Sequence, residues 1–178
     1  FDQSRRGSSV PARVTGVHKN RFTVHDGLTE KLAVPSGKLL HQTPAAVPVV
    51  GDWVLIDEQV IVERLPRKNH FSRAAAGSRG KQDPAPERSQ VMAANLDAVF
   101  IVTGTDRDFN VRRIERYLTL VYHCGLNPVI VLTKADLHPD PQRFVHQVES
   151  VTFGVPVHLV HAGDDQGLVP LAAYLSTG

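Results

Sequence analysis

Two patterns of hydrophobic positions divide the chain. Up to about residue 73, apolar and polar residues alternate over short runs that are rich in β-branched side chains. After residue 90, unbroken apolar runs alternate with amphipathic stretches. Alternation with a period of two predicts half-buried strands, and short unbroken apolar runs between helical patterns predict strands buried on both faces. The sequence therefore predicts a β domain followed by an α/β domain.

The first domain, residues 1–73, is predicted to be a small β-barrel. Turn residues such as Asn20 and Asp26-Gly27 separate its strand-like runs. The predicted strands are residues 10–18, 21–25, 29–34, 52–56 and 59–65. Five short strands fit an OB-fold barrel, and an SH3-like barrel has a similar pattern, so the pattern alone leaves both open.

Residues 74–90 differ from both neighbours in composition. Alanine, serine and charged residues replace the apolar alternation, and Gly77, Gly80, Pro84 and Pro86 disfavour regular structure. This composition predicts a flexible linker between the barrel and a second domain at residues 91–178.

Strands and helices alternate in the second domain. Predicted strands at residues 97–103, 128–132 and 155–160 are followed by predicted helices. Asn110 is a suitable cap for the first helix, Gly125 ends it, and its apolar stripe is Ile114, Leu118, Val121 and Tyr122. The other two helices are expected at residues 141–151 and 168–175. Such alternation predicts a parallel sheet with right-handed crossovers, whose ligands bind at the carboxyl ends of the strands.

Two candidate base-binding segments follow successive strands at that edge. The first is Thr133-Lys134-Ala135-Asp136, and the second contains His161 and Ala162. A carboxylate can accept two hydrogen bonds from guanine, a lysine stem can cover the base plane, and a small residue lets a backbone N–H approach guanine O6. Taken singly, Asp136 also fits an acid at a helix start and the second segment an ordinary glycine-containing loop. Their placement at one sheet edge favours a guanine site.

Composition and charge narrow the picture further. The 178 residues carry a formal charge of +2, contain one cysteine, Cys124, and have no run long enough to cross a membrane. One cysteine forms no intrachain disulfide and fits a reducing cytoplasm, and no histidine lies in a metal-ligand spacing with it. Basic residues near the linker are candidate RNA contacts or simply a solvated connector. They are Arg64, Arg67, Lys68 and Arg73.

Several segments in order resemble the ribosome small-subunit-dependent GTPase A family, RsgA. They are PVVGDWV (residues 48–54), LPRKNHFSR (65–73), QVMAANLDAVFIVTG (90–104), DFNVRRIERYL (108–118), PVIVLTKADL (128–137) and VPVHLV (155–160). In such GTPases the base-reading motif is NKxD, followed by an SA-containing loop. Thr133 here replaces the asparagine and His161 the serine, so the expected base identity rests mainly on Asp136.

The resemblance implies an OB-fold followed by a circularly permuted GTPase domain and then a zinc-binding C-terminal domain. It implies binding of GTP and GDP, magnesium in the full-length protein, and slow GTP hydrolysis stimulated by the small ribosomal subunit during late assembly. No GxxxxGK[ST] loop occurs in these residues, so no catalytic residue is assigned and the chain alone is not expected to hydrolyse GTP. The resemblance also implies that the protein is a cytoplasmic monomer whose partner is the small ribosomal subunit with its 16S rRNA. The alternatives are a non-catalytic RNA- or ribosome-binding module and an α/β domain that binds no nucleotide.

Overall fold

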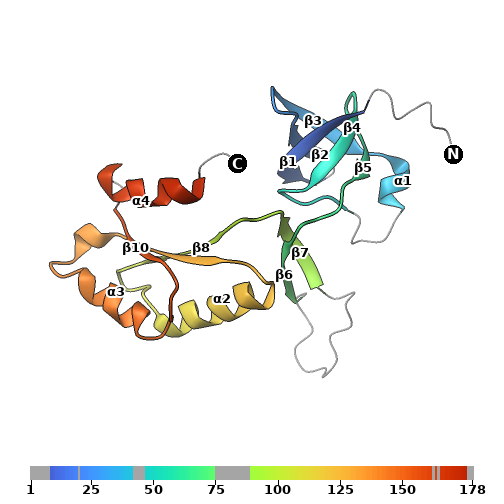
Figure 1. Ribbon diagram of the computed structural model, residues 1–178. Coiled ribbons are helices and arrows are strands. Elements are labelled where there is room, and N and C mark those ends of the chain that lie inside the picture. The colour runs from blue at the N-terminus through green and yellow to red at the C-terminus, as the bar shows by residue number, and fades with distance from the viewer. Residues whose placement is uncertain are drawn as a thin grey trace, which may run out of the picture. The chain divides into compact units, whose positions relative to one another are not determined.

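The computed structural model describes residues 9–19, 21–41, 47–74, 89–161, 163 and 165–175. The chain forms two compact units, Phe1–Leu96 and Asp97–Gly178 (Figure 1). No helix in the described part of the chain is long and apolar enough to cross a membrane.

The first unit contains a closed five-stranded barrel, as the sequence predicts. Its strands are β1 Val10–His18, β2 Arg21–His25, β3 Glu30–Pro35, β4 Trp53–Asp57 and β5 Val60–Arg64. They are ordered β1-β2-β3-β5-β4, and β1 closes the barrel by pairing with β4. Neighbouring strands run antiparallel except β3 and β5, which are parallel. This Greek-key order is that of an OB-like barrel, which decides between the two barrel types that the sequence left open.

Alternate residues of the strands fill the barrel. The short helix α1, Gly37–Leu40, adds Leu39 to this core, and its cap residue Ser36 accepts a hydrogen bond from the Leu39 backbone at 3.3 Å. The sequence did not predict α1, because four residues are too few to establish a helical period. The buried core residues are Ala12, Val14, Phe22, Val24, Ala33, Leu39, Val54, Ile56 and Ile61.

A two-stranded ribbon also belongs to the first unit. Its strands, β6 His70–Ala74 and β7 Ser89–Ala94, pair antiparallel and flank residues 75–88, which lie outside the described residues. The expected linker at residues 74–90 thus overlaps both strands, and the boundary between the compact units falls later, between Leu96 and Asp97. Gly51 fits closely beneath the ribbon: its φ is +89°, and an added Cβ would lie 2.0 Å from the Ala94 carbonyl oxygen.

Two asparagine side chains hold the open end of the ribbon: Asn69 joins its two strands, and Asn95 ties it to Gly51, shortly before β4. Asn69 exchanges two hydrogen bonds of 2.8 Å with the backbone of Leu96. Asn95 donates to the Gly51 carbonyl at 2.9 Å and accepts from the Lys68 backbone at 2.8 Å. Asn95 has a φ of 54°, a conformation that asparagine adopts more readily than most residues. Both side chains are therefore structural.

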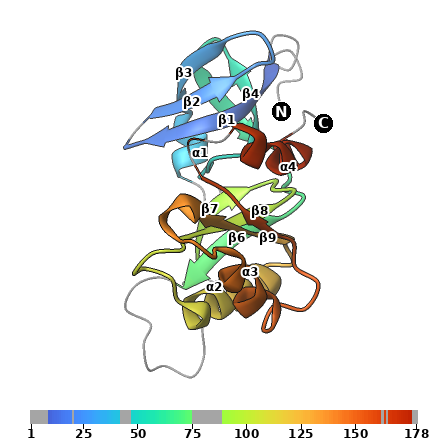
Figure 2. The ribbon, with the colours of Figure 1, turned by 90° about the vertical axis from the view of Figure 1, so that its left-hand side faces the viewer.

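The second unit is a parallel α/β sheet, as predicted. Its strands, β8 Val99–Gly104, β9 Pro128–Thr133 and β10 Val157–Leu159, are ordered β10-β9-β8 and all run parallel. The helices α2 Val111–His123 and α3 Gln142–Glu149 lie on one face of the sheet, and α4 Asp165–Leu175 lies on the other (Figure 2). Every residue of β9 except Thr133 is buried, as expected for the central strand.

The first helix of this unit begins and ends where the sequence predicts. The Asn110 side chain accepts a hydrogen bond from the Arg113 backbone at 3.1 Å, and Gly125 follows the helix with a φ of +66°. The predicted stripe residues Ile114, Leu118 and Val121 are buried, but Tyr122 is 54% exposed. Tyr122 lies one position past the centre of the stripe, so the prediction that it packs in the core was wrong.

Candidate functional site

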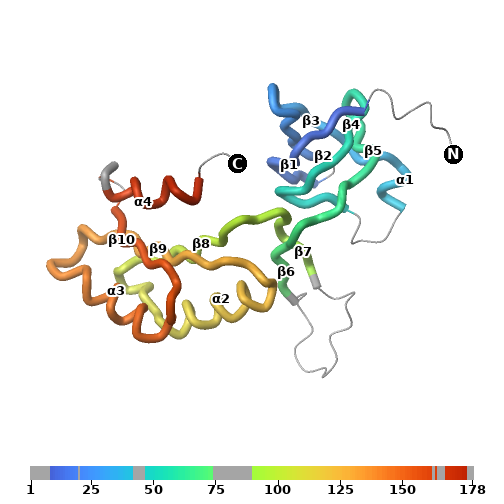
Figure 3. Tube along the Cα trace, viewed as in Figure 1, coloured from blue at the N-terminus to red at the C-terminus, as the bar shows by residue number. Residues whose placement is uncertain are grey.

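Three loops meet at the carboxyl edge of the sheet, one after each strand (Figure 3). The end of β8 and the loop after it contribute residues 104–106, the end of β9 and the loop after it contribute residues 133–136, and the loop after β10 starts at Val160. Backbone hydrogen bonds join neighbouring loops: the Thr105 N–H donates to the Thr133 carbonyl at 2.9 Å, and the Ala135 N–H donates to the Val160 carbonyl at 3.4 Å. The two predicted base-binding segments are therefore neighbours in the structure.

The turn after β9 has an unusual backbone conformation. Lys134 is left-handed, with φ 62° and ψ 35°, and leads into a single 3₁₀ turn, Ala135–Leu137. Asp136 lies in this turn with its side chain exposed. Non-glycine residues in this conformation are held there by surrounding contacts and cluster at functional sites. Here the buried Thr105 hydroxyl donates to the Lys134 carbonyl at 2.8 Å.

The Lys134 side chain is ion-paired rather than free. Its ammonium lies 2.5 Å from Asp106 Oδ2, and Asp106 Oδ1 accepts a hydrogen bond from the Asp108 backbone at 3.2 Å. The hydrogen bond from Lys134 holds the pKa of Asp106 below its usual range, and the same bond raises the pKa of Lys134. Both groups are therefore charged at neutral pH. The edge thus carries this ion pair and, in addition, the exposed carboxylate of Asp136.

The remaining base-site candidates lie beside this pair. The Thr133 hydroxyl donates to the carbonyl of Thr103 at 3.4 Å, so it bridges β9 and β8. His161 is half-buried at the start of the loop after β10, and Ala162 lies outside the described residues. The structure thus brings Thr133, Lys134, Asp136 and His161 to one edge.

Sequence reasoning missed three contributors to this edge: Gly104, Thr105 and Asp106. A signal for them was present, because they lie at the carboxyl end of the predicted strand that became β8, and the carboxyl-end rule applies to each parallel strand. The base-reading motif, on which the predicted site depends, lies after β9 and does not include them.

The candidate RNA contacts lie in the first unit, and the structure separates their roles. Arg67 forms two hydrogen bonds of 2.7 Å with the fully buried carboxylate of Asp52, so its guanidinium is already engaged. Arg64 donates to the Leu65 carbonyl at 3.2 Å, and partial burial lowers its pKa. Lys68 and Arg73 have exposed side chains.

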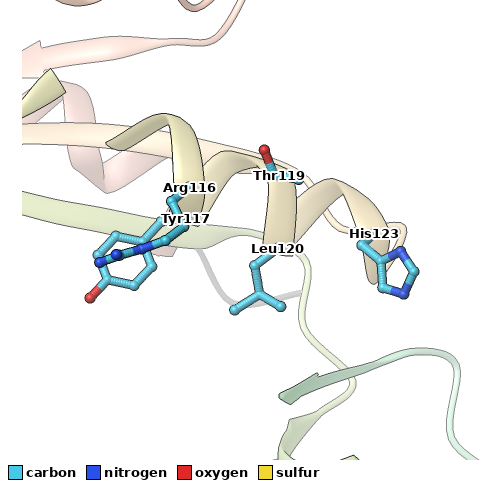
Figure 4. A pocket seen from close by; sticks show the side chains of 5 residues that line it. All are labelled: Arg116, Tyr117, Thr119, Leu120 and His123. Atoms are coloured by element: carbon cyan, nitrogen blue, oxygen red, sulfur yellow. The ribbon is translucent and has the colours of Figure 1, made fainter. Parts of the chain in front are cut away.

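An open hollow lies along the outer face of α2 and contains none of these candidates. Its lining residues are Arg116, Tyr117, Thr119, Leu120 and His123 (Figure 4). The Arg116 guanidinium lies 5.7 Å from the centre of the Tyr117 ring. Among the described residues there is also no group of three or more His, Cys, Asp or Glu that could hold a metal ion.

The fold and the site define a class: an OB-like barrel followed by a parallel α/β unit with polar residues at the carboxyl edge of its sheet. The RsgA GTPase family matches residues 64–178. The chain belongs to the RsgA GTPase family.

Individual relatives agree with this assignment. The chain is 41% identical over 184 residues to the small ribosomal subunit biogenesis GTPase RsgA of Syntrophotalea carbinolica, covering 100% of this chain and 50% of that protein. It is 39% identical to the protein of the same name from Opitutus terrae, covering 95% and 48%. The crystal structure of YjeQ from Thermotoga maritima matches with a TM-score of 0.70 and 25% identity, over 94% of this chain and 57% of that one. The chain thus spans about half the length of the curated relatives it matches.

Proposed function

We propose that this chain is the guanine-reading and ribosome-contacting part of a GTPase that acts in maturation of the small ribosomal subunit. The observation that carries the proposal is the adjacency of the 133–136 turn and the loop after β10 at the sheet edge. The relatives named as small ribosomal subunit biogenesis GTPases support the choice of process. GTP hydrolysis is proposed for the whole protein.

Each edge residue has a distinct proposed role. The Asp136 carboxylate accepts hydrogen bonds from guanine N1–H and the exocyclic amine. The Lys134 stem covers one face of the base, and the loop of His161 and Ala162 presents a backbone N–H to guanine O6. Thr133, whose hydroxyl is directed to the Thr103 carbonyl, positions the turn. These contacts orient the nucleotide without stabilising charge on a transferred phosphoryl group.

The described residues include no cluster of metal ligands that could hold the magnesium or zinc expected of the full-length protein. Magnesium in such an enzyme is held beside the phosphates by a phosphate-binding loop, and no GxxxxGK[ST] loop occurs in the 178 residues. Neither magnesium nor the zinc of the proposed C-terminal domain is assigned to a residue here.

Hydrolysis assays test the proposal. The full-length protein is expected to hydrolyse GTP and to do so faster when small ribosomal subunits are added, whereas the 178-residue chain is expected to be inactive in both conditions. Phosphate release is measured for both proteins with and without subunits. A full-length protein that binds subunits but shows no GTP turnover would favour the alternative, a non-catalytic ribosome-binding module.

The RNA-contacting role is proposed for the barrel, where an exposed aromatic ring lies next to a fixed cation. Trp53 begins β4 and is 43% exposed, and Arg13 lies opposite it on β1. The Arg13 guanidinium lies 6.0 Å from the ring centre and donates to the Asn95 carbonyl at 3.1 Å. Exposed aromatic rings beside cations stack unpaired bases while the cation contacts phosphate.

We therefore expect single-stranded RNA from the 16S sequence to quench the fluorescence of Trp53, which is the only tryptophan in the chain. Arg13→Gln should weaken this binding and lower the salt dependence of the binding constant by about one phosphate contact. Lys31→Gln is the matched control, because Lys31 is a basic residue of the same barrel that pairs with Asp26. Equal binding by wild type and Arg13→Gln would remove Arg13 from the proposed surface.

A further inference from the structure

We infer that residues 104–106, the last residue of β8 and the start of the loop after it, are a positioning element of the base site. In this element Asp106 holds the Lys134 ammonium and so fixes the lysine stem that covers the base. The inference rests on the proposed function, because it concerns how that site binds guanine. It adds Gly104, Thr105 and Asp106 to a site for which the sequence motif supplies only the turn after β9 and the loop after β10.

The starting observation is the left-handed backbone of Lys134. A lysine adopts this conformation at a cost, and it persists only where neighbouring contacts determine it. At this position the contacts come largely from the loop after β8. The buried Thr105 hydroxyl fixes the Lys134 carbonyl at 2.8 Å, and the Thr105 N–H fixes the preceding carbonyl, that of Thr133, at 2.9 Å. The backbone direction of Lys134 is therefore set by Thr105.

The side chain of Lys134 is fixed by the next residue of the same loop. Asp106 Oδ2 lies 2.5 Å from the ammonium, while its other oxygen is held by the Asp108 backbone at 3.2 Å. The Asp108 carbonyl in turn accepts a hydrogen bond from Arg113 in the first turn of α2. Asp106 is thus anchored to the loop and the loop to a helix, so the carboxylate is a fixed point for the lysine.

Gly104 provides the space that this arrangement needs. A Cβ at Gly104 would lie 2.8 Å from Asp106 Oδ1 and 3.4 Å from Lys134 Cδ. The stem and the carboxylate therefore pack directly over the Gly104 backbone, and a larger residue would displace one of them.

Exposure argues that the ion pair orients the lysine rather than stabilising the fold. The Lys134 side chain is 52% exposed and that of Asp106 26%. Exposed pairs of this kind contribute little to folding stability, because water solvates both charges and screens their attraction. This pair adds little stability, but it joins two loops at the proposed base-binding edge. Its main effect is therefore to fix the position of the lysine stem.

The test uses Asp106→Asn in the full-length protein, with nucleotide binding measured by calorimetry. Loss of the pair should weaken binding by about 2- to 5-fold. The loss should be equal for GTP, GDP and GMP, because the change acts on the base side and not at the phosphates. Asp106→Glu should restore most of the affinity. Asp140→Asn, which removes an exposed carboxylate from the loop before α3, is the matched control and should bind like wild type.

A second set of variants separates positioning from general destabilisation. In a Lys134→Ala background, Asp106→Asn should cause no further loss, because the stem that Asp106 positions is gone, and the melting temperature of the single variant should match wild type. An equal loss in both backgrounds, or no loss in Asp106→Asn, would overturn this inference while leaving the proposed function intact. Failure of the wild-type protein to bind any guanine nucleotide would overturn the proposed function, and this inference with it.

Discussion

Replacing Asp136 by asparagine is expected to move the base preference of the full-length protein from guanine toward xanthine. The carboxylate matches the two adjacent donors of guanine, N1–H and the exocyclic amine. Xanthine carries a carbonyl in place of that amine, and an asparagine amide can donate to it. If the change removes about 1.5–3 kcal/mol of charge-assisted bonding, GTP affinity falls roughly 10- to 200-fold. The exposed position of Asp136 at the sheet edge leaves its carboxylate accessible to a base.

Titration of wild type and Asp136→Asn with GTP and XTP measures this shift, and Asp140→Asn again serves as the control that removes an exposed carboxylate nearby in sequence. The competing interpretation is that Asp136 only stabilises the start of its short turn through the helix dipole, an effect of at most about one kcal/mol on folding. In that case GTP affinity would be unchanged in Asp136→Asn and XTP would gain nothing, which would remove Asp136 from the base site.

The elements that the sequence predicted well are those whose signal is local. All five barrel strands and the three strands of the α/β unit lie within a few residues of their predicted bounds. Period-two alternation and unbroken apolar runs each lie within the residues of a single strand. A short stretch of sequence therefore contains all the information that predicts the strand. The cap at Asn110 and the stop at Gly125 are local for the same reason.

The ribbon of β6 and β7 escaped prediction because its stabilisation is not local. His70 pairs with Ala94 and Arg73 with Gln90, across a stretch of glycine, proline and charged residues. Each strand alone is short and lacks clear alternation, so its state depends on a partner that a sequence window does not include. The composition of residues 74–90 suggested a linker for this reason.

The same limit applies to the site. The turn after β9 was predicted because a four-residue motif carries it, but the Asp106–Lys134 pair joins residues 28 apart in the sequence. Only the parallel pairing of β8 with β9 brings them together. Likewise Arg67 looks like any other basic residue near the linker until the fold places it against Asp52, which lies 15 residues earlier.

The buried Arg67–Asp52 pair is expected to stabilise the first unit strongly. Asp52→Asn should lower the free energy of unfolding of this unit by about 3–5 kcal/mol. Asp52 is fully buried, and each of its carboxylate oxygens receives a hydrogen bond of 2.7 Å from Arg67. Its Oδ2 also accepts from the Val49 backbone at 2.8 Å. An asparagine replaces one of those oxygens with an NH₂ group, so two donors face each other and the largely buried guanidinium loses its counter-charge.

Urea unfolding of the 178-residue chain, followed by the fluorescence of the adjacent Trp53, measures this loss in the unit that contains both residues. Glu63→Gln removes an exposed carboxylate from β5 and should stay within about 0.5 kcal/mol of wild type. The double variant Asp52→Leu with Arg67→Met should recover much of the loss, because two apolar side chains leave no buried charge without a partner. If Asp52→Asn unfolds within about 1 kcal/mol of wild type, the buried pair contributes little to the stability of this unit and the prediction is wrong.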